Sequence, residues 1–114
     1  MIDVSISNYR ILSLFYSSEI RIYRYLFYTW KHQLGSDKIN QEIENKFNEL
    51  YERSEKIYEI ILNTLKEMDA CDMGNELLLL GRYQEQNNEL FKVYKDMKEI
   101  IETEFKNIKK SVMN

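Results

Sequence analysis

The chain has 114 residues and carries a net charge of −3 at pH 7, with a pI of about 5.3. Apolar residues make up 44% of it and charged residues 31%, which is the composition of a globular protein and excludes a disordered one. The length suits one domain, and the negative balance opposes non-specific binding to nucleic acid.

Turn-forming residues are scarce, which favours long helices. Proline is absent and glycine occurs 3 times, so few positions direct the backbone to turn. Turn and cap chemistry gathers at 69–75 and at 34–37, where Gly35 can end a helix and Ser36 or Asp37 can cap the next. We therefore predict an all-α, elongated antiparallel bundle of three long helices, near 5–34, 37–69 and 73–112, in a single domain spanning 1–114.

The first predicted helix carries one stripe that we assign to the core. Its members recur at helical spacing and are Leu12, Phe15, Tyr16, Ile22, Tyr23, Leu26 and Trp30. Helical phase also places Glu19 among them, where an unpaired carboxylate would be costly. We expect Glu19 to pair with Arg10, Tyr23 or a polar residue of another helix, or to reach solvent, in a structural role.

A second stripe runs down another side of the same helix. Leu14, Arg21, Tyr25, Tyr28 and His32 recur at spacings of seven, four, three and four, and Arg24 and Lys31 flank them. Tyr and Arg are enriched at protein interfaces, so we interpret these seven residues as a candidate partner-binding surface. Ordinary packing against neighbouring helices and a groove for single-stranded nucleic acid are the alternatives.

The middle helix has the clearest pattern. Its apolar seam repeats every seventh residue and is flanked by further apolar positions: Ile43, Leu50 and Ile57, then Phe47, Ile61 and Met68 with Ser54 filling the gap, and beside them Tyr51, Tyr58 and Leu65. This is the broad apolar stripe of a bundle helix. The glutamates fall mostly on the other side and indicate a solvated face.

The last helix has spacings of three and four along one face, made by Leu90, Tyr94, Met97, Ile101, Phe105, Ile108 and Val112. Upstream, the apolar run 77–80 is followed by Gly81 and then by the polar residues 84–88. A break near Gly81 would give four helices. A continuous helix with Asn87 on its buried seam is equally consistent, because one buried Asn can fix the register between helices. We favour the continuous helix.

We find no motif for catalysis or for binding a metal or cofactor. The only cysteine, Cys71, has no disulfide partner and is interpreted as a small, partly buried thiol. The only histidine, His32, lacks a nucleophile motif and the Glu-x-x-His pair of metal-binding bundles. The apolar region 11–30 contains too many polar groups for a membrane span, and no signal peptide is visible. We expect a non-enzymatic, cytoplasmic protein.

Segment 32–36, His-Gln-Leu-Gly-Ser, resembles the His-x-Leu-Lys-Gly-Ser motif of histidine phosphotransfer domains, with one residue missing. These domains are helical bundles of similar length, and the resemblance implies phosphorylation of His32. The missing residue turns the glycine and serine by about 100° around a helix, and here the segment is predicted to end one. In size and architecture the chain is also similar to export chaperones of flagellar and type III systems, and to small phage-borne inhibitors of host defence or replication machinery.

We predict a protein–protein interaction module, either an adaptor, a chaperone-like protein or an inhibitor. It would present the second stripe to another protein or to a second copy of itself, with Arg21, Tyr25 and Tyr28 at the centre. Three alternatives remain: a phage-type inhibitor of a host nucleic-acid-processing machine, a nucleic-acid-binding bundle and a histidine phosphotransfer-like protein. The sequence predicts no cofactor and no membrane partner.

Overall fold

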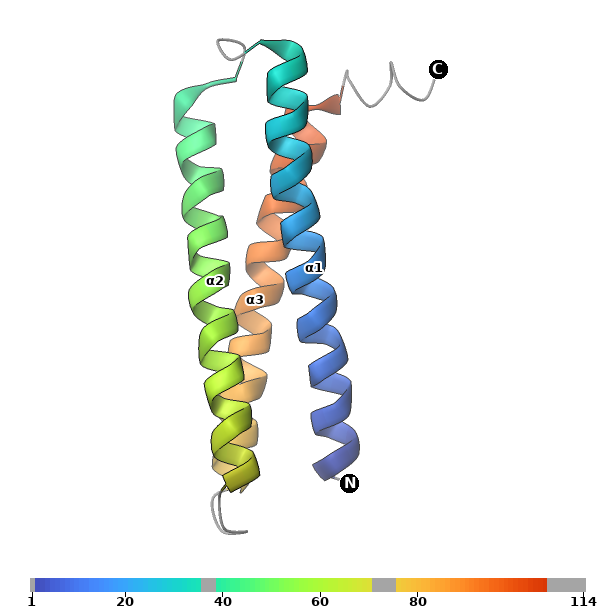
Figure 1. Ribbon diagram of the computed structural model, residues 1–114, viewed down its shortest axis with the longest axis vertical. Helices are drawn as coiled ribbons and strands as arrows, with labels where there is room; N and C mark the ends of the chain where they lie inside the picture. Colours follow the sequence, from blue (N-terminus) through green and yellow to red (C-terminus); the bar gives the residue numbers. More distant parts are fainter. Residues whose placement is uncertain (1, 36–38, 71–75, 107–114) are drawn as a thin grey trace.

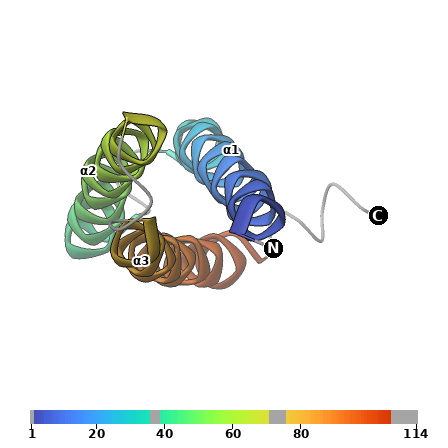
Figure 2. The same ribbon diagram turned by 90° about the horizontal axis from the view of Figure 1, so that it is seen from below.

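The computed structural model describes residues 2–35, 39–70 and 76–106, and the regular structure within these ranges is helical. Helix α1 spans Ile2–Leu34, α2 spans Gln41–Ala70 and α3 spans Glu76–Glu104. They run up, down and up through an elongated bundle whose longest axis measures 55 Å (Figure 1). Seen from below, the helices lie at the corners of a triangle (Figure 2). The prediction of an all-α bundle of three long helices is confirmed.

Gly35 ends α1, as its position in the sequence predicts. Its φ angle is 100°, in the left-handed region that glycine adopts without a steric penalty. The backbone N–H of Gly35 donates a hydrogen bond to the carbonyl of Lys31 at 3.0 Å. This bond satisfies one of the carbonyls that the end of a helix leaves unpaired.

Helix α2 begins at Gln41, four residues later than predicted, because its cap is Asn40. The Asn40 side-chain oxygen accepts a hydrogen bond from the backbone N–H of Glu42 at 2.8 Å, which is the usual N-cap interaction. Ser36 and Asp37, the caps expected from the sequence, lie outside the described residues. The capping position itself belongs to Asn40.

Helix α3 is continuous through Gly81, which confirms the favoured prediction. Gly81 is exposed, and apart from the adjoining residues and the backbone of the same helix no heavy atom lies within 4 Å of the position that a Cβ would take. Asn87 is buried on the helix seam, as the continuous helix requires. Helix α3 ends at Glu104, earlier than predicted, and the segment 107–114 lies outside the described residues. Cys71 lies outside them too.

The core is built mainly from the predicted seams of α2 and α3. Its buried apolar members are Ile20, Phe27, Ile39, Phe47, Leu50, Ile57, Ile61, Met68, Leu79, Tyr83, Leu90, Val93, Met97, Ile101 and Phe105. Ser54 also lies in the core, where its hydroxyl donates to the carbonyl of Tyr51 at 2.6 Å. Such a bond to the preceding turn satisfies a buried hydroxyl without a partner from another helix.

The core face predicted for α1 is wrong in phase. Ser13, Ile20 and Phe27 are the buried positions, and they follow one another at seven-residue spacing. Tyr16, Tyr23, Leu26 and Trp30 of the predicted stripe pack partly buried at the edge of this core, whereas Leu12, Phe15 and Ile22 are exposed. The cause is that apolar residues surround almost the whole of α1, so their spacing does not say which side is buried. Glu19 is half-buried on the same edge.

Candidate protein-binding groove

Three clefts follow one another between α1 and α2. The basic cleft has a volume of about 630 Å³ and is lined by Arg21, Arg24, Tyr25, Tyr28, Thr29, His32, Gln33 and Tyr51. The middle cleft, of about 350 Å³, is lined by Ser17, Ile20, Arg21, Tyr51, Ser54, Glu55, Tyr58, Glu59, Leu62 and Leu90. The lower cleft, of about 230 Å³, is lined by Arg10, Ser13, Leu14, Tyr58, Ile61, Leu62, Leu65 and Tyr83.

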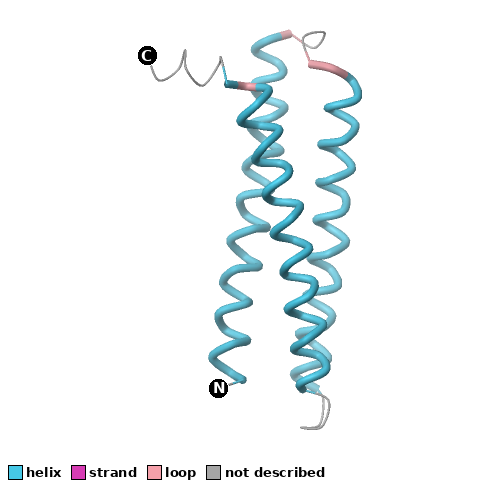
Figure 3. Tube along the Cα trace, turned by 180° about the vertical axis from the view of Figure 1, so that it is seen from behind, coloured by secondary structure: helices cyan, strands magenta, loops and turns pink. Residues whose placement is uncertain are grey.

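The three clefts form one surface, which we name the α1–α2 groove. Arg21 and Tyr51 line both the basic and the middle cleft, and Tyr58 and Leu62 line both the middle and the lower cleft. Helix α3 lies across the other side of the α1–α2 pair (Figure 3). It supplies the floor of the groove through side chains such as Leu90, which is fully buried.

The groove is open because α1 and α2 contact each other mainly near the loop that joins them. There the rings of Phe27 and Phe47 stack with centroids 4.2 Å apart. The Tyr28 hydroxyl donates to the side-chain oxygen of Asn48 at 2.6 Å. Lower down, the ring contacts and hydrogen bonds of α1 within the described residues are with α3. The Tyr9 and Tyr83 rings, for example, meet edge to face at 5.8 Å.

A buried polar group also ties the lower half of α1 to α3. The Ser13 hydroxyl donates to the side-chain oxygen of Asn87 at 2.9 Å and lies 3.1 Å from the Tyr83 hydroxyl. Because the single proton of Ser13 goes to Asn87, the Tyr83 hydroxyl acts as donor to Ser13. Burial raises the pKa of the Tyr83 hydroxyl. This network draws α1 towards α3 and leaves the α2 side open.

The basic cleft contains positive charge that other side chains do not neutralise. Among the described residues, no carboxylate lies within 4.0 Å of the guanidinium of Arg21 or of Arg24. Arg24 instead lies over the ring of Tyr51, with 4.4 Å between the guanidinium carbon and the ring centroid. This cation–π contact holds the Arg24 side chain in place and leaves its charge available.

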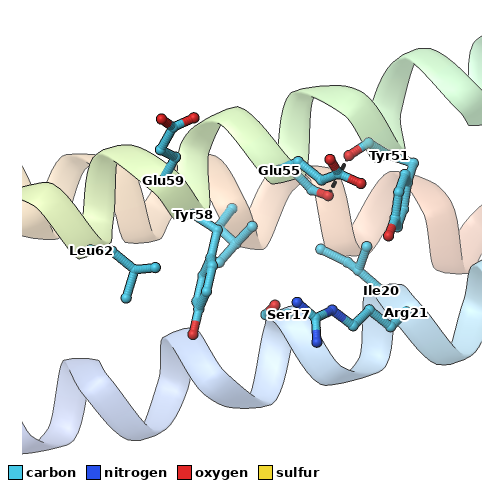
Figure 4. A pocket seen from close by; sticks show the side chains of 10 residues that line it. Ser17, Ile20, Arg21, Tyr51, Glu55, Tyr58, Glu59 and Leu62 are labelled. Atoms are coloured by element: carbon cyan, nitrogen blue, oxygen red, sulfur yellow. Dashed lines mark hydrogen bonds between the residues drawn. The ribbon is translucent and has the colours of Figure 1, made fainter.

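In the middle cleft, opposite charges and aromatic rings face each other across the groove. Tyr51 and Tyr58 project from α2 towards α1, and Arg21 lies along α1 between them (Figure 4). Glu55 and Glu59 line the α2 side of the same cleft. The groove is therefore basic on α1 and acidic at the middle of α2, while its lower end is largely apolar.

The structure brings together five of the seven candidate residues from the sequence. Arg21, Arg24, Tyr25, Tyr28 and His32 all line the basic cleft. Leu14 lines the lower cleft. Lys31 turns towards α2, where its ammonium lies 2.5 Å from a carboxylate oxygen of Glu44, and both side chains are largely buried.

The sequence reasoning missed the contribution of α2 to this site. Tyr51 lines the basic cleft and supplies the ring under Arg24. The available signal was its place at the edge of the apolar seam of α2, where a tyrosine can bury its ring and expose its hydroxyl. Thr29 and Gln33, which carry no distinctive chemistry, complete the lining on α1.

The structure also places His32 and Glu19, two further residues that the sequence analysis singled out. His32 is exposed in the last turn of α1, so the segment that resembles a phosphotransfer motif is a helix end, as predicted. Glu19 lies beside Tyr23. Burial raises the pKa of the Tyr23 hydroxyl, Tyr94 raises it further, and the negative charge of Glu19 adds to the shift. Glu19 thus acts within the α1–α3 seam and away from the groove.

The chain matches no protein-family model, no curated protein and no solved structure. None of the described helices is long and apolar enough to cross a membrane. Within the described ranges, no group of three or more His, Cys, Asp and Glu side chains is arranged to hold a metal ion. The geometry of the α1–α2 groove is therefore the basis for a functional proposal.

Proposed function

We propose that this protein is a non-enzymatic interaction module that binds an acidic, amphipathic helical segment of another protein in its α1–α2 groove. The observation that carries the proposal is the pair of arginines in the basic cleft. Arg21 and Arg24 have no carboxylate within 4.0 Å among the described residues, and they lie beside the exposed ring of Tyr25. Acidic side chains of a partner would complete their ion pairs.

A helix is the form of partner that suits the groove. The groove lies between two helices and is floored by a third, which is where a fourth helix of a bundle would pack. Its lower part offers apolar contacts through Leu14, Leu62 and Leu65. An amphipathic helix can place its apolar face there at spacings of three and four, and its carboxylates over the basic cleft.

The charge distribution favours an acidic protein segment over nucleic acid. Glu55 and Glu59 line the cleft next to the arginines, and they would repel the continuous phosphate backbone of a nucleic acid. A peptide can match the groove residue by residue, with carboxylates opposite Arg21 and Arg24 and uncharged or basic groups opposite the two glutamates. A module of this kind would act as an adaptor, a chaperone-like protein or an inhibitor.

The test uses two labelled helical peptides of equal length with the same leucine face. One carries glutamates on its polar face and the other carries lysines, and binding is followed by fluorescence anisotropy at physiological ionic strength. We expect the acidic peptide to bind the protein and the basic peptide to bind much more weakly. Arg21→Glu/Arg24→Glu should weaken binding of the acidic peptide by about tenfold or more, which corresponds to about 1.4 kcal/mol.

A matched control separates local recognition from overall charge. Lys56 and Lys66 are exposed on α2 and line none of the three clefts. Lys56→Glu/Lys66→Glu changes the net charge by the same amount and should leave binding nearly unchanged. Equal losses for the two double variants, or none for either, would contradict the proposal. A single-stranded oligonucleotide that binds more tightly than the acidic peptide would favour the nucleic-acid alternative.

A further inference from the structure

The outward face of α1 carries a second ordered pattern, most of which lies outside the groove. Its residues follow spacings of four, three, four, three and four: Ile11, Phe15, Ser18, Ile22, Tyr25 and Thr29. These are the a and d spacings of a heptad repeat, the pattern by which one helix packs along another. We name this set the outer seam of α1.

The outer seam lies opposite the core face of the same helix. The buried positions Ser13, Ile20 and Phe27 take the heptad place farthest from the seam. In the view from below, neither α2 nor α3 covers the side of α1 that faces away from them (Figure 2). Helices that are apolar on every side are normally buried on every side, so this exposed face of α1 lacks a covering partner among the residues that the structure describes.

The large apolar side chains of the seam remain substantially exposed: Ile11 by 65%, Phe15 by 49%, Ile22 by 48% and Tyr25 by 71%. Taking about 200 Å² for a full side chain of this size, they expose on the order of 500 Å² in each copy. Two copies that covered these side chains would bury about 1,000 Å², which is about the area that a specific protein interface needs.

The charges bordering the seam also suit a copy of the same helix. Glu19 lies along one edge of the seam and Arg21 along the other, and Ile11, Phe15, Ser18, Ile22, Tyr25 and Thr29 themselves carry no charge. The two bordering charges cancel, so the seam offers no net charge by which a foreign partner could be selected. A second copy meets the same pair of opposite charges, and a register that keeps like charges apart is available to it.

From this pattern we infer that two copies of the chain associate through the outer seams of their α1 helices, as a two-stranded coiled coil within a six-helix assembly. Ile11, Phe15, Ser18 and Ile22 line none of the three clefts, whereas Tyr25 and Thr29, at one end of the seam, also line the basic cleft. The basic cleft of each copy would therefore lie beside the dimer interface. Association would place two grooves in one particle, which could then bind two helical segments of one partner. Multivalent binding of this kind raises overall affinity without any new contact.

The test measures molar mass in solution by light scattering after size exclusion. We expect a dimer for the wild type, with twice the 13.9 kDa of one chain. Ile11→Glu/Ile22→Glu should convert it to a monomer of unchanged helical content, because charges on the seam of one copy would face apolar groups and like charges of the other. A wild-type monomer at high micromolar concentration would overturn the inference, as would a double variant that stays dimeric.

Two further variants make the result specific. Ile60→Glu/Leu78→Glu places the same charges on similarly exposed apolar residues of α2 and α3, and it should remain dimeric. If it dissociates too, the seam is not the interface. Ser18→Glu changes a residue that is already polar and exposed, so it costs the monomer no packing and should still dissociate the dimer. These variants leave Arg21 and Arg24 unchanged. The proposal of a dimer and the proposal of a peptide-binding groove can therefore be refuted independently of each other.

Discussion

Phe27 of α1 and Phe47 of α2 stack with their ring centroids 4.2 Å apart and their planes 12° from parallel. Both rings are fully buried, and the ring of Phe105, directly after the end of α3, meets Phe27 edge to face at 5.4 Å. This three-helix contact lies at the end of the bundle where the loop joins α1 to α2. It is the main apolar link between the two walls of the groove, so it determines how far they can separate.

We therefore expect Phe47→Ala to be among the most destabilising single changes. Removal of a fully buried ring should lower the free energy of unfolding by about 3–5 kcal/mol, measured by urea denaturation followed by circular dichroism. Phe91→Ala serves as the control, because the Phe91 side chain is substantially exposed on α3, and it should cost less than half as much. Equal losses for the two variants would mean that the stack does not anchor α1.

The Lys31–Glu44 pair should contribute to stability and not to partner binding. Its atoms lie 2.5 Å apart and both side chains are largely buried, so loss of one partner leaves the other charge poorly solvated. We expect Lys31→Met to lower the free energy of unfolding by about 1–3 kcal/mol, and Lys31→Met/Glu44→Leu to recover part of that loss. The acidic peptide should bind the double variant nearly as well as the wild type. A tenfold loss would assign Lys31 to the binding surface.

The structure explains why the core of α2 could be predicted and that of α1 could not. In α2, glutamates and lysines occupy most of the solvent side, so the apolar seam through Phe47 and Ile57 has one consistent phase. In α1, apolar residues occur on nearly every side, and a small polar residue, Ser13, takes a core position. The spacing alone then indicates a helix but not its buried face. The covered face depends on which side α2 and α3 approach.

Only the α1 wall of the candidate site could be predicted from the sequence. The repetition of Arg21, Tyr25, Tyr28 and His32 along α1 identified residues that do share a cleft. Whether a basic side chain of α1 stays available to a partner depends on the register between α1 and α2. That register cannot be read from the sequence of α1 alone. Register places Glu44 beside Lys31, while Tyr51 lies under Arg24. For the same reason, the groove between two helices could not be inferred from either helix alone.

The buried hydroxyl of Ser13 should hold α1 in register on α3. Ser13→Ala would leave the Tyr83 hydroxyl and the Asn87 side-chain oxygen without this partner, at a cost of about 1–3 kcal/mol in the free energy of unfolding. Ser13→Ala/Asn87→Leu removes the donor and the acceptor together and should cost less than the sum of the single changes. Thermal and urea unfolding of the four proteins measure the coupling. If the losses of the two single variants simply add in the double variant, the hydrogen bond between Ser13 and Asn87 does not stabilise the packing of α1 on α3.

Stability should fall at alkaline pH because burial raises the pKa values of Tyr23 and Tyr83. Below about pH 9, folded and unfolded chains both keep these protons, and the two tyrosines add no pH dependence. Above it the unfolded chain releases them first, so the free energy of unfolding falls as pH rises towards the folded-state pKa values. Tyr23→Phe/Tyr83→Phe should flatten this fall between about pH 9 and pH 11, measured by urea titrations at each pH. A double variant whose stability falls as steeply as that of the wild type would refute the assignment.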